Sequence, residues 1–145
     1  MRVYLDNCAI QRPLDDQTQL RIRAETEAVL GLLALCEAGT LDLVVSGVHH
    51  VENLQCPHPD RHDHVNDVLN LARSYVPATP DILRRAKQYE SLGIKRFDSL
   101  HLASAVEAKV DYFCTTDDRL LRKGKAADTI DVSVVSPLEL VILLH

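Results

Sequence analysis

Apolar residues along this chain gather in short clusters separated by polar loops. The clusters at residues 3–5, 41–45 and 112–114 are brief, rich in Val, Leu and aromatic residues, and end abruptly. This pattern is typical of buried β-strands. Tyr75-Val76 and the run from Val132 to Val135 predict two further short strands.

Longer segments between these clusters follow helical spacing. Apolar residues recur with a helical period from about Thr18 to Ala38, and Gly39 follows as a stop signal. Ser46 is a suitable N-cap for a helix that begins near Val48 and is broken by the prolines at 57 and 59. Further helices are expected over residues 64–74, 80–92, 97–108 and after 136–137, whereas residues 11–17 are expected to form a loop.

Strands that alternate with helices predict an α/β fold. Right-handed crossovers would build a central parallel sheet of four to five strands flanked by helices on both faces. The chain has no repeat, low-complexity stretch or linker, so residues 1–145 are expected to form a single domain. Ligands of such sheets bind outside the carboxyl ends of the strands, which is where we look for chemistry.

Four acidic residues are expected at this edge of the sheet. Asp6 follows the first strand, Asp117 follows the strand over 112–114, and Glu52 and Asp98 lie on helices that begin near the same edge. Carboxylate oxygens suit Mg²⁺ or Mn²⁺, and two such ions can drive phosphodiester hydrolysis. Spacing alone leaves a second interpretation open, in which these residues are turn, cap or solvated surface residues.

The ordered set of short motifs around these acids resembles the PIN domain. The match runs from residue 2 to about residue 140 and consists of Tyr4-Leu5-Asp6-Asn7, Val51-Glu52-Asn53, Asp98-Ser99-Leu100-His101-Leu102-Ala103 and Thr115-Thr116-Asp117. The chain also resembles stand-alone PIN proteins related to VapC toxins, in which a Leu-Asp-Asn segment precedes a motif similar to Arg12-Pro13-Leu14-Asp15-Asp16.

This resemblance implies a PIN-like three-layer fold and a metal-dependent ribonuclease. Asp6, Glu52, Asp98 and Asp117 would be the catalytic, metal-binding acids, with Asn7 and Thr115 in support. Asn7 stands where many members of the family carry Ser or Thr. Asp118 leaves the identity of the fourth acid open, although Asp117 is favoured because it completes Thr-x-Asp.

The resemblance also implies a biological role. The expected activity is Mg²⁺- or Mn²⁺-dependent hydrolysis of RNA by a VapC-like toxin of a type II toxin–antitoxin system, restrained by an antitoxin protein. A homodimer would suit a protein of this size. The alternative is a non-catalytic PIN module that binds RNA or a partner protein, which the intact acidic set disfavours. A receiver domain and a haloacid-dehalogenase site are excluded, because the first lacks its acidic pair and Lys and the second its Asp-x-Asp.

Basic residues and histidines supply further candidates. Basic residues near the acids in sequence are expected either to hold RNA phosphates or to form solvated surface: Lys95, Arg96, Arg119, Arg122, Lys123 and Lys125. The histidine-rich segment from His49 to His64 offers a conceivable zinc site, although exposed loop histidines are the alternative. His49 is spaced to approach the metal site from the face of Glu52, and His101 either packs structurally or hydrogen-bonds near Asp98.

Composition changes this picture only slightly. The formal net charge of −5 argues mildly against a polyanionic partner, but cations bound at a carboxylate cluster would reverse the local sign. The chain has no Trp, four Tyr and two Phe, which disfavours a nucleic-acid surface built on aromatic stacking platforms. Four cysteines without C-x-x-C spacing, no leader and no membrane-length apolar run favour a cytoplasmic protein that does not enter a membrane.

Overall fold

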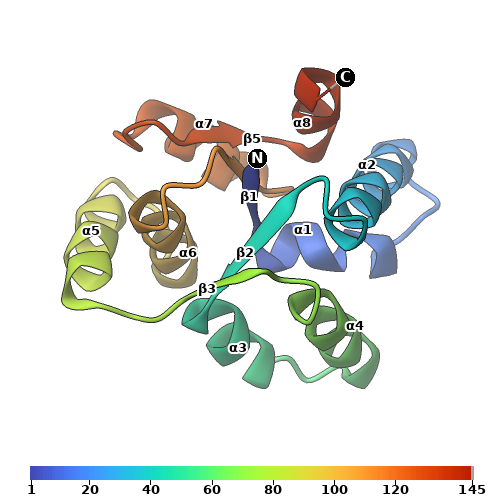
Figure 1. The fold of residues 1–145 in the computed structure, drawn as a ribbon, viewed down its shortest axis with the longest axis horizontal. Coiled ribbons are helices and arrows are strands. Elements are labelled where there is room, and N and C mark those ends of the chain that lie inside the picture. Colours follow the sequence, from blue (N-terminus) through green and yellow to red (C-terminus); the bar gives the residue numbers. More distant parts are fainter. Residues whose placement is uncertain (145) are drawn as a thin grey trace.

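The structure is a computed structural model that describes residues 1–144 (Figure 1). Five strands form the sheet: β1 Arg2–Leu5, β2 Asp42–Ser46, β3 Ser74–Val76, β4 Tyr112–Cys114 and β5 Ser133–Val135. The α-helices are α1 Asn7–Gln11, α2 Leu20–Glu37, α3 Gly47–Leu54, α4 Pro59–Leu69, α5 Pro80–Ser91, α6 Arg96–Glu107, α7 Asp118–Ala126 and α8 Pro137–Leu144, and a 3₁₀ turn covers Arg12–Leu14.

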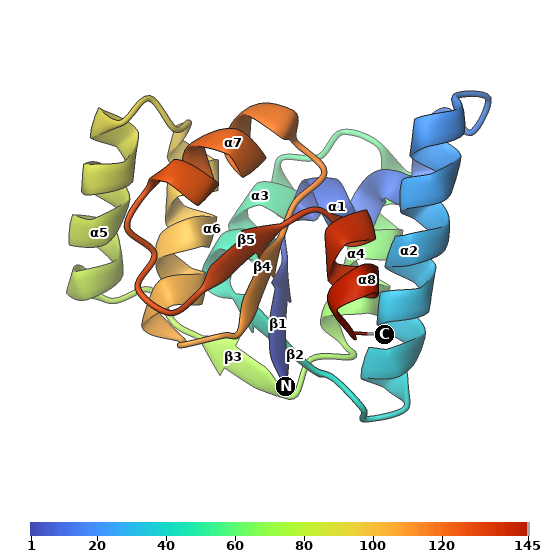
Figure 2. The ribbon, with the colours of Figure 1, turned by 90° about the horizontal axis from the view of Figure 1, so that it is seen from above.

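All five strands are parallel, in the order β3-β2-β1-β4-β5. The chain builds outward from β1 through β2 to β3, and then returns to place β4 on the other side of β1. In the register of the central pair, Leu5 lies opposite Cys114. β1 and β4 therefore flank the point where strand order reverses, and such switch points are where open α/β sheets bind ligands. In Figure 2, β1 rises from the N-terminus, and α1, α3 and α7 lie toward its far end.

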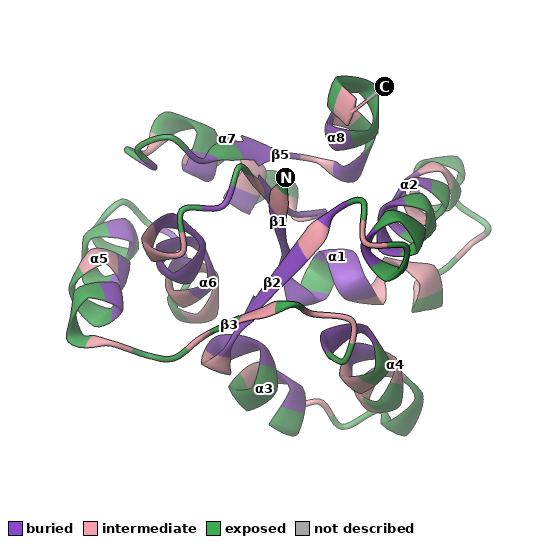
Figure 3. Ribbon diagram, viewed as in Figure 1, coloured by how far each residue is buried: buried purple, intermediate pink, exposed green. Residues whose placement is uncertain are grey.

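Alternation along the strands creates two cores, one on each face of the sheet. Val3 and Leu5 face a core shared with α1, α2, α4 and α8, whereas Tyr4 faces a core shared with α5, α6 and α7. On β4 the same alternation places Cys114 in the first core and Phe113 in the second. Figure 3 shows the inner strands largely buried between helices that turn their exposed sides outward, whereas the edge strand β3 is only partly covered. The predicted three-layer α/β class is confirmed.

Several predicted boundaries were wrong. The helix expected over 64–74 is α4, which starts at Pro59 because proline is compatible with the first turn of a helix. Part of the expected loop over 11–17 is the 3₁₀ turn, and α1 and α7 were not predicted. α7 is polar and buries only Leu120 and Gly124, so its apolar signal is weak.

The described part of the chain contains neither a membrane-spanning helix nor a disulfide. Within residues 1–144, no helix is both long and apolar enough to cross a membrane. The four cysteines are all free thiols, as their spacing predicted.

The C-terminus of α2 requires a glycine. Gly39 adopts φ +81°, its N–H donates to the carbonyl of Cys36 (3.1 Å), and the N–H of Thr40 donates to the carbonyl of Leu35 (2.9 Å). These two bonds form a Schellman motif, whose left-handed position strains any residue with a Cβ. Gly31, in the middle of the same helix, has open space around its position.

We expect the same substitution to have opposite effects at these two glycines. Gly39→Ala should lower the free energy of unfolding by about 1 kcal/mol, whereas Gly31→Ala should raise it by about 0.5–1 kcal/mol. Urea denaturation of the two variants and the parent measures both values. A stabilising Gly39→Ala would contradict the described end of α2.

Candidate active site

Asp6 occupies the end of β1 and is almost completely buried, with 1% of its surface exposed. It is the N-cap of α1, where its Oδ1 accepts a hydrogen bond from the N–H of Ala9 (2.9 Å). Its Oδ2 accepts a hydrogen bond from the hydroxyl of Thr115 (2.6 Å), which follows β4. Both carboxylate oxygens are thus held in place, and the ends of the two central strands are joined by side chains.

Asp117 is tied to the same junction. Its N–H donates to the hydroxyl oxygen of Thr115 (3.1 Å), and its Oδ1 caps α7 by accepting from the N–H of Leu120 (2.9 Å). Thr115 therefore donates to one acid and accepts from the backbone of another. This buried hydroxyl is therefore satisfied both as a donor and as an acceptor.

The neighbouring acid, Asp118, is exposed and turned toward α2. Its two carboxylate oxygens accept hydrogen bonds from the guanidinium group of Arg21, one of them at 2.8 Å. These bonds hold the pKa of Asp118 below its ordinary value. Asp118 is thus committed to an ion pair on the surface, and Asp117 is the acid that faces the others.

Glu52 reaches the site from α3 through a buried polar network. The Nε2 atom of His101 donates to Oε1 of Glu52 (3.1 Å), since a carboxylate can only accept. The Nδ1 atom of His101 lies 2.6 Å from the hydroxyl of Tyr4, which lies 2.7 Å from the hydroxyl of Ser46. His101 is 1% exposed. It is thus both packed in the core and bonded to an acid, so it combines the two roles considered from the sequence.

Asp98 completes the set from the first turn of α6, where a negative charge is favoured by the helix dipole. Burial raises its pKa above the ordinary value, and the charges of Asp117 and Glu52 raise it further. Burial likewise raises the pKa of Asp6 to about 7, against the lowering effect of its hydrogen bonds with Thr115 and Ala9, and Asp98 adds to the rise. The structure thus brings the four predicted acids within range of mutual repulsion.

The thiol of Cys8 lies within range of the same carboxylates. Cys8 is exposed, yet its pKa lies well above the ordinary value, first because of the charge of Asp6, then because of burial and the charges of Asp98, Glu52 and Asp117. The fields of all four carboxylates overlap at this one atom. A thiol held protonated in this way is a poor nucleophile.

The carboxylates are a fitting donor set for a divalent cation. No three His, Cys, Asp or Glu side chains among residues 1–144 already stand close enough together to enclose a metal ion. Mg²⁺ does not need such a cage, because it keeps several waters and binds through one or two carboxylates. Burial, and to a smaller extent mutual repulsion, raises the pKa values of Asp6 and Asp98, and a bound cation would offset both effects.

Asn7, the residue after Asp6, is buried with 3% of its surface exposed. Its amide nitrogen makes a long hydrogen bond to the carbonyl of His49 (3.4 Å), and its Oδ1 is buried without a partner in the described part of the chain. A buried acceptor without a donor is costly, so this oxygen is suited to a ligand that brings one.

Basic side chains line the two hollows beside the acids, but only some of the predicted ones. Lys95, Arg119 and Lys123 line a small hollow together with Asp98 and Asp117. Arg96 and Arg122 are exposed and are not among its lining residues. Of the six basic residues named for RNA contact, the structure therefore places Lys95, Arg119 and Lys123 beside Asp98 and Asp117.

A larger hollow, of about 430 Å³, lies on the other side of Asp117. Arg12, Arg61 and Arg119 line it together with Cys8. Arg61 comes from α4 and is held by Oδ1 of Asp15 (2.8 Å). No motif in the sequence singles out Arg61, which lies outside every segment that carries one of the four predicted acids.

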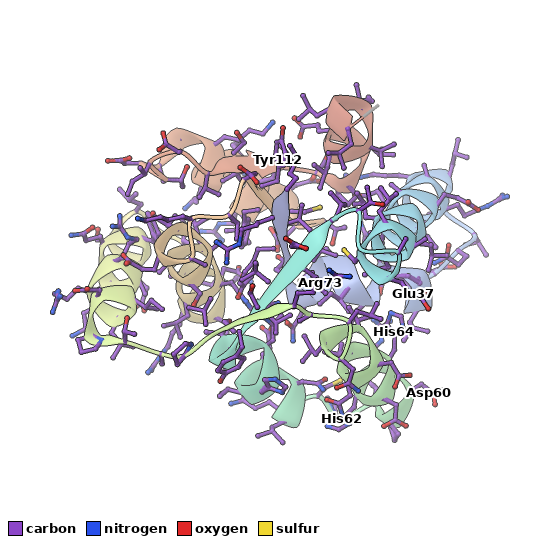
Figure 4. All side chains as sticks on the ribbon, viewed as in Figure 1. Glu37, Asp60, His62, His64, Arg73 and Tyr112 are labelled. Atoms are coloured by element: carbon purple, nitrogen blue, oxygen red, sulfur yellow. The ribbon has the colours of Figure 1, made fainter. Side chains whose placement is uncertain are left out.

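The histidine-rich segment does not form a metal site within the described residues. The prediction that His49 approaches the metal is wrong, because its Nδ1 accepts from the N–H of Ser46 (3.0 Å) and its Nε2 donates to the carbonyl of Leu5 (2.7 Å). His49 thereby fills the third helical position of a capping box on α3. His62 and His64 project from different sides of α4 in Figure 4, and the Nε2 of His64 bonds the carbonyl of Ile10 (2.8 Å).

Comparison with known proteins places the fold. No family model matches the sequence, and no curated protein matches it either. VapBC2 from Rickettsia felis, solved bound to a DNA fragment from its promoter, contains a similar chain: 11% identity, TM-score 0.57, covering 94% of this chain and 98% of that one. PAE2754 from Pyrobaculum aerophilum is also similar, at 15% identity and TM-score 0.52, covering 99% of this chain and 89% of that one. At these identities the likeness shows the fold alone, and that fold is PIN-like.

The raised pKa of Asp6 predicts that stability falls as pH rises. The folded carboxyl keeps its proton up to about pH 7, whereas the unfolded one loses it near 3.8. The contribution of Asp6 to stability is therefore greatest below the unfolded value and is lost as pH rises through about 7. In EDTA, the melting temperature of Asp6→Asn, which does not titrate, should rise relative to wild type by several degrees between about pH 5 and pH 8.

The quantity compared is the melting temperature of Asp6→Asn minus that of the wild type at each pH. Any cost of placing an amide beside Thr115 is the same at both pH values and cancels. A difference that stays constant over this range would show that Asp6 is ionised throughout.

Proposed function

We propose that this chain is a divalent-metal-dependent ribonuclease that hydrolyses phosphodiester bonds of RNA. Asp6, Glu52, Asp98 and Asp117 would hold Mg²⁺ or Mn²⁺. The observation that carries the proposal is that these acids meet beside the switch point of the sheet. Thr115 joins Asp6 to the backbone of Asp117, and Asp98 lines the same hollow as Asp117.

The chain's own residues prepare the site in distinct ways. Thr115 and the N–H of Ala9 fix both oxygens of Asp6, and His101 fixes one oxygen of Glu52. When bound, Mg²⁺ or Mn²⁺ would activate a water and stabilise the leaving oxygen. Lys95 and Arg119, beside Asp98 and Asp117, would hold phosphates of the substrate near this centre.

We further propose that the protein is a VapC-like toxin with an antitoxin partner. Its fold is similar to that of a chain in VapBC2, a complex solved on DNA from its own promoter. Four free cysteines suit the reducing cytoplasm where such a toxin would meet RNA. The second candidate is a non-catalytic module, in which the acids would be retained without a metal role.

Cleavage and metal binding should depend on the same acids. We expect the purified protein to cut RNA with Mn²⁺ or Mg²⁺ and to stop in EDTA. Asp98→Asn should reduce cleavage by at least about a hundredfold, because the substitution removes one negatively charged ligand of the cation. It should also raise the melting temperature in EDTA and shrink the rise that Mn²⁺ gives the wild type, because repulsion is relieved and metal affinity lost.

Asp118→Asn is the matched control. It removes a carboxylate adjacent to Asp117, but one that is paired with Arg21 on the surface. Cleavage and the Mn²⁺ shift should both persist in this variant. Equal losses in Asp98→Asn and Asp118→Asn, or activity that survives chelation, would argue for the non-catalytic module.

Growth tests the toxin role separately from the nuclease role. Induced expression of the wild type should arrest growth of the host, and Asp98→Asn should relieve the arrest at equal protein level. Unimpaired growth on wild-type expression, together with RNA cleavage by the purified protein, would point to a nuclease that is not a toxin.

A further inference from the structure

Phe97 occupies an unusual place for an aromatic residue in this chain. Of the two phenylalanines, Phe113 is completely buried in the core between the sheet and α6. Phe97 is only half-buried and belongs to neither hydrophobic core of the described residues. It lies in the first turn of α6, immediately before Asp98. Core packing therefore does not account for it.

The ring of Phe97 lines an open hollow of about 550 Å³ beside Glu52. That volume lies within the range of about 300–1,000 Å³ typical of small-ligand sites. Gln55 and His58, which follow α3, contribute polar groups to the same hollow. An aromatic face beside a few polar side chains is the composition that recognises an unpaired nucleobase.

Asn7 adds an unsatisfied acceptor to this hollow. Its side chain is among the lining residues, and its Oδ1 is buried without a hydrogen-bond partner within residues 1–144. The amide nitrogen is already directed to the carbonyl of His49. The free oxygen needs an N–H or O–H donor, which a nucleotide supplies through its base amine or its ribose hydroxyl.

Arg61 supplies a fixed positive charge at the border of the hollow. Its guanidinium group donates to Asp15 (2.8 Å), to Gln11 (3.2 Å) and to the carbonyl of Leu14 (3.0 Å). Arg61, Gln11 and Cys8 line both this hollow and the one that contains Asp117 and Arg119. The two hollows therefore adjoin one another, with Glu52 lining one and Asp117 lining the other.

We propose that the hollow at Phe97 is a nucleotide subsite for single-stranded RNA. An unpaired base would stack on Phe97 and give a donor to Oδ1 of Asn7, and the following phosphates would run past the acids toward Arg119. A base within a duplex is stacked and paired, so its face is closed to Phe97. This inference rests on the proposed ribonuclease function and narrows its substrate class to unpaired regions of RNA.

One aromatic ring is consistent with the scarcity of aromatic residues. A chain with two Phe, four Tyr and no Trp cannot build a long stacking platform. A subsite for one base needs a single exposed ring, and stacking is tolerant of which base it holds. We therefore expect selection by strand state, with little preference for base identity from the ring itself.

The test is binding of an oligouridine decamer that carries a single 2-aminopurine, with Ca²⁺ in place of Mn²⁺ so that cutting does not intervene. Stacking on Phe97 should change the 2-aminopurine fluorescence. Phe97→Leu should weaken binding roughly tenfold, the loss expected for one base–aromatic stack, and Phe97→Trp should preserve it. Tyr75→Leu, which removes an exposed ring on β3, is the matched control and should leave binding unchanged.

Thermal melting of each variant verifies that it folds, and a duplex of the same length gives the comparison for strand state. Binding that is equal in wild type and Phe97→Leu, Phe97→Trp as weak as Phe97→Leu, or no binding of the single strand would each overturn the proposal. Binding that depends on Phe97 in a protein that does not cut with Mn²⁺ would support the subsite and contradict the ribonuclease. RNA cleavage by a protein whose binding does not depend on Phe97 would support the ribonuclease and contradict the subsite.

Discussion

The hydrogen bond from the hydroxyl of Thr115 to Asp6 joins the ends of β1 and β4, and the site depends on this junction. Parallel pairing of the two strands brings the residues that follow them to the same edge, and Leu5 opposite Cys114 places Asp6 and Thr115 as neighbours. Because Thr115 also accepts from the N–H of Asp117, one buried hydroxyl positions two acids from distant parts of the sequence. The strand order reverses at this pair, and the hollows lined by Asp98, Asp117 and Glu52 lie around it.

Placing charge at this junction opposes stability, and the surrounding groups offset only part of the cost. Burial and Asp98 raise the pKa of Asp6, whereas Thr115, Ala9 and His101 lower it. The net result is still a pKa of about 7, well above the ordinary value. An amide or a hydroxyl at this position would avoid the cost of burying a charge, which a bound cation would offset in the proposed function.

Features that follow from strand order were predictable from the sequence, and features that follow from packing were not. Asp6 and Asp117 follow apolar runs, so the edge they share could be predicted from alternation alone. Glu52 and Asp98 lie on helices that were expected to begin near the same edge, and the resemblance to PIN domains then favoured a shared metal site over separate caps and surface charges. The roles of the remaining residues depend on hydrogen bonds that exist only in the folded protein. Asp118 was separated from Asp117 by its pairing with Arg21, and both ring nitrogens of His49 were taken by backbone groups.

The most direct measurement of the central claim is anomalous X-ray diffraction from a crystal of the protein grown with Mn²⁺. If the four acids share one metal centre, a manganese peak should lie within coordination distance of Asp98 and at least one of Asp6, Glu52 and Asp117, with waters in the remaining positions. The peak should be absent from a crystal of Asp98→Asn prepared in the same way. A manganese ion bound only elsewhere, for example at the histidines of the segment from His58 to His64, with none between the acids, would contradict the account.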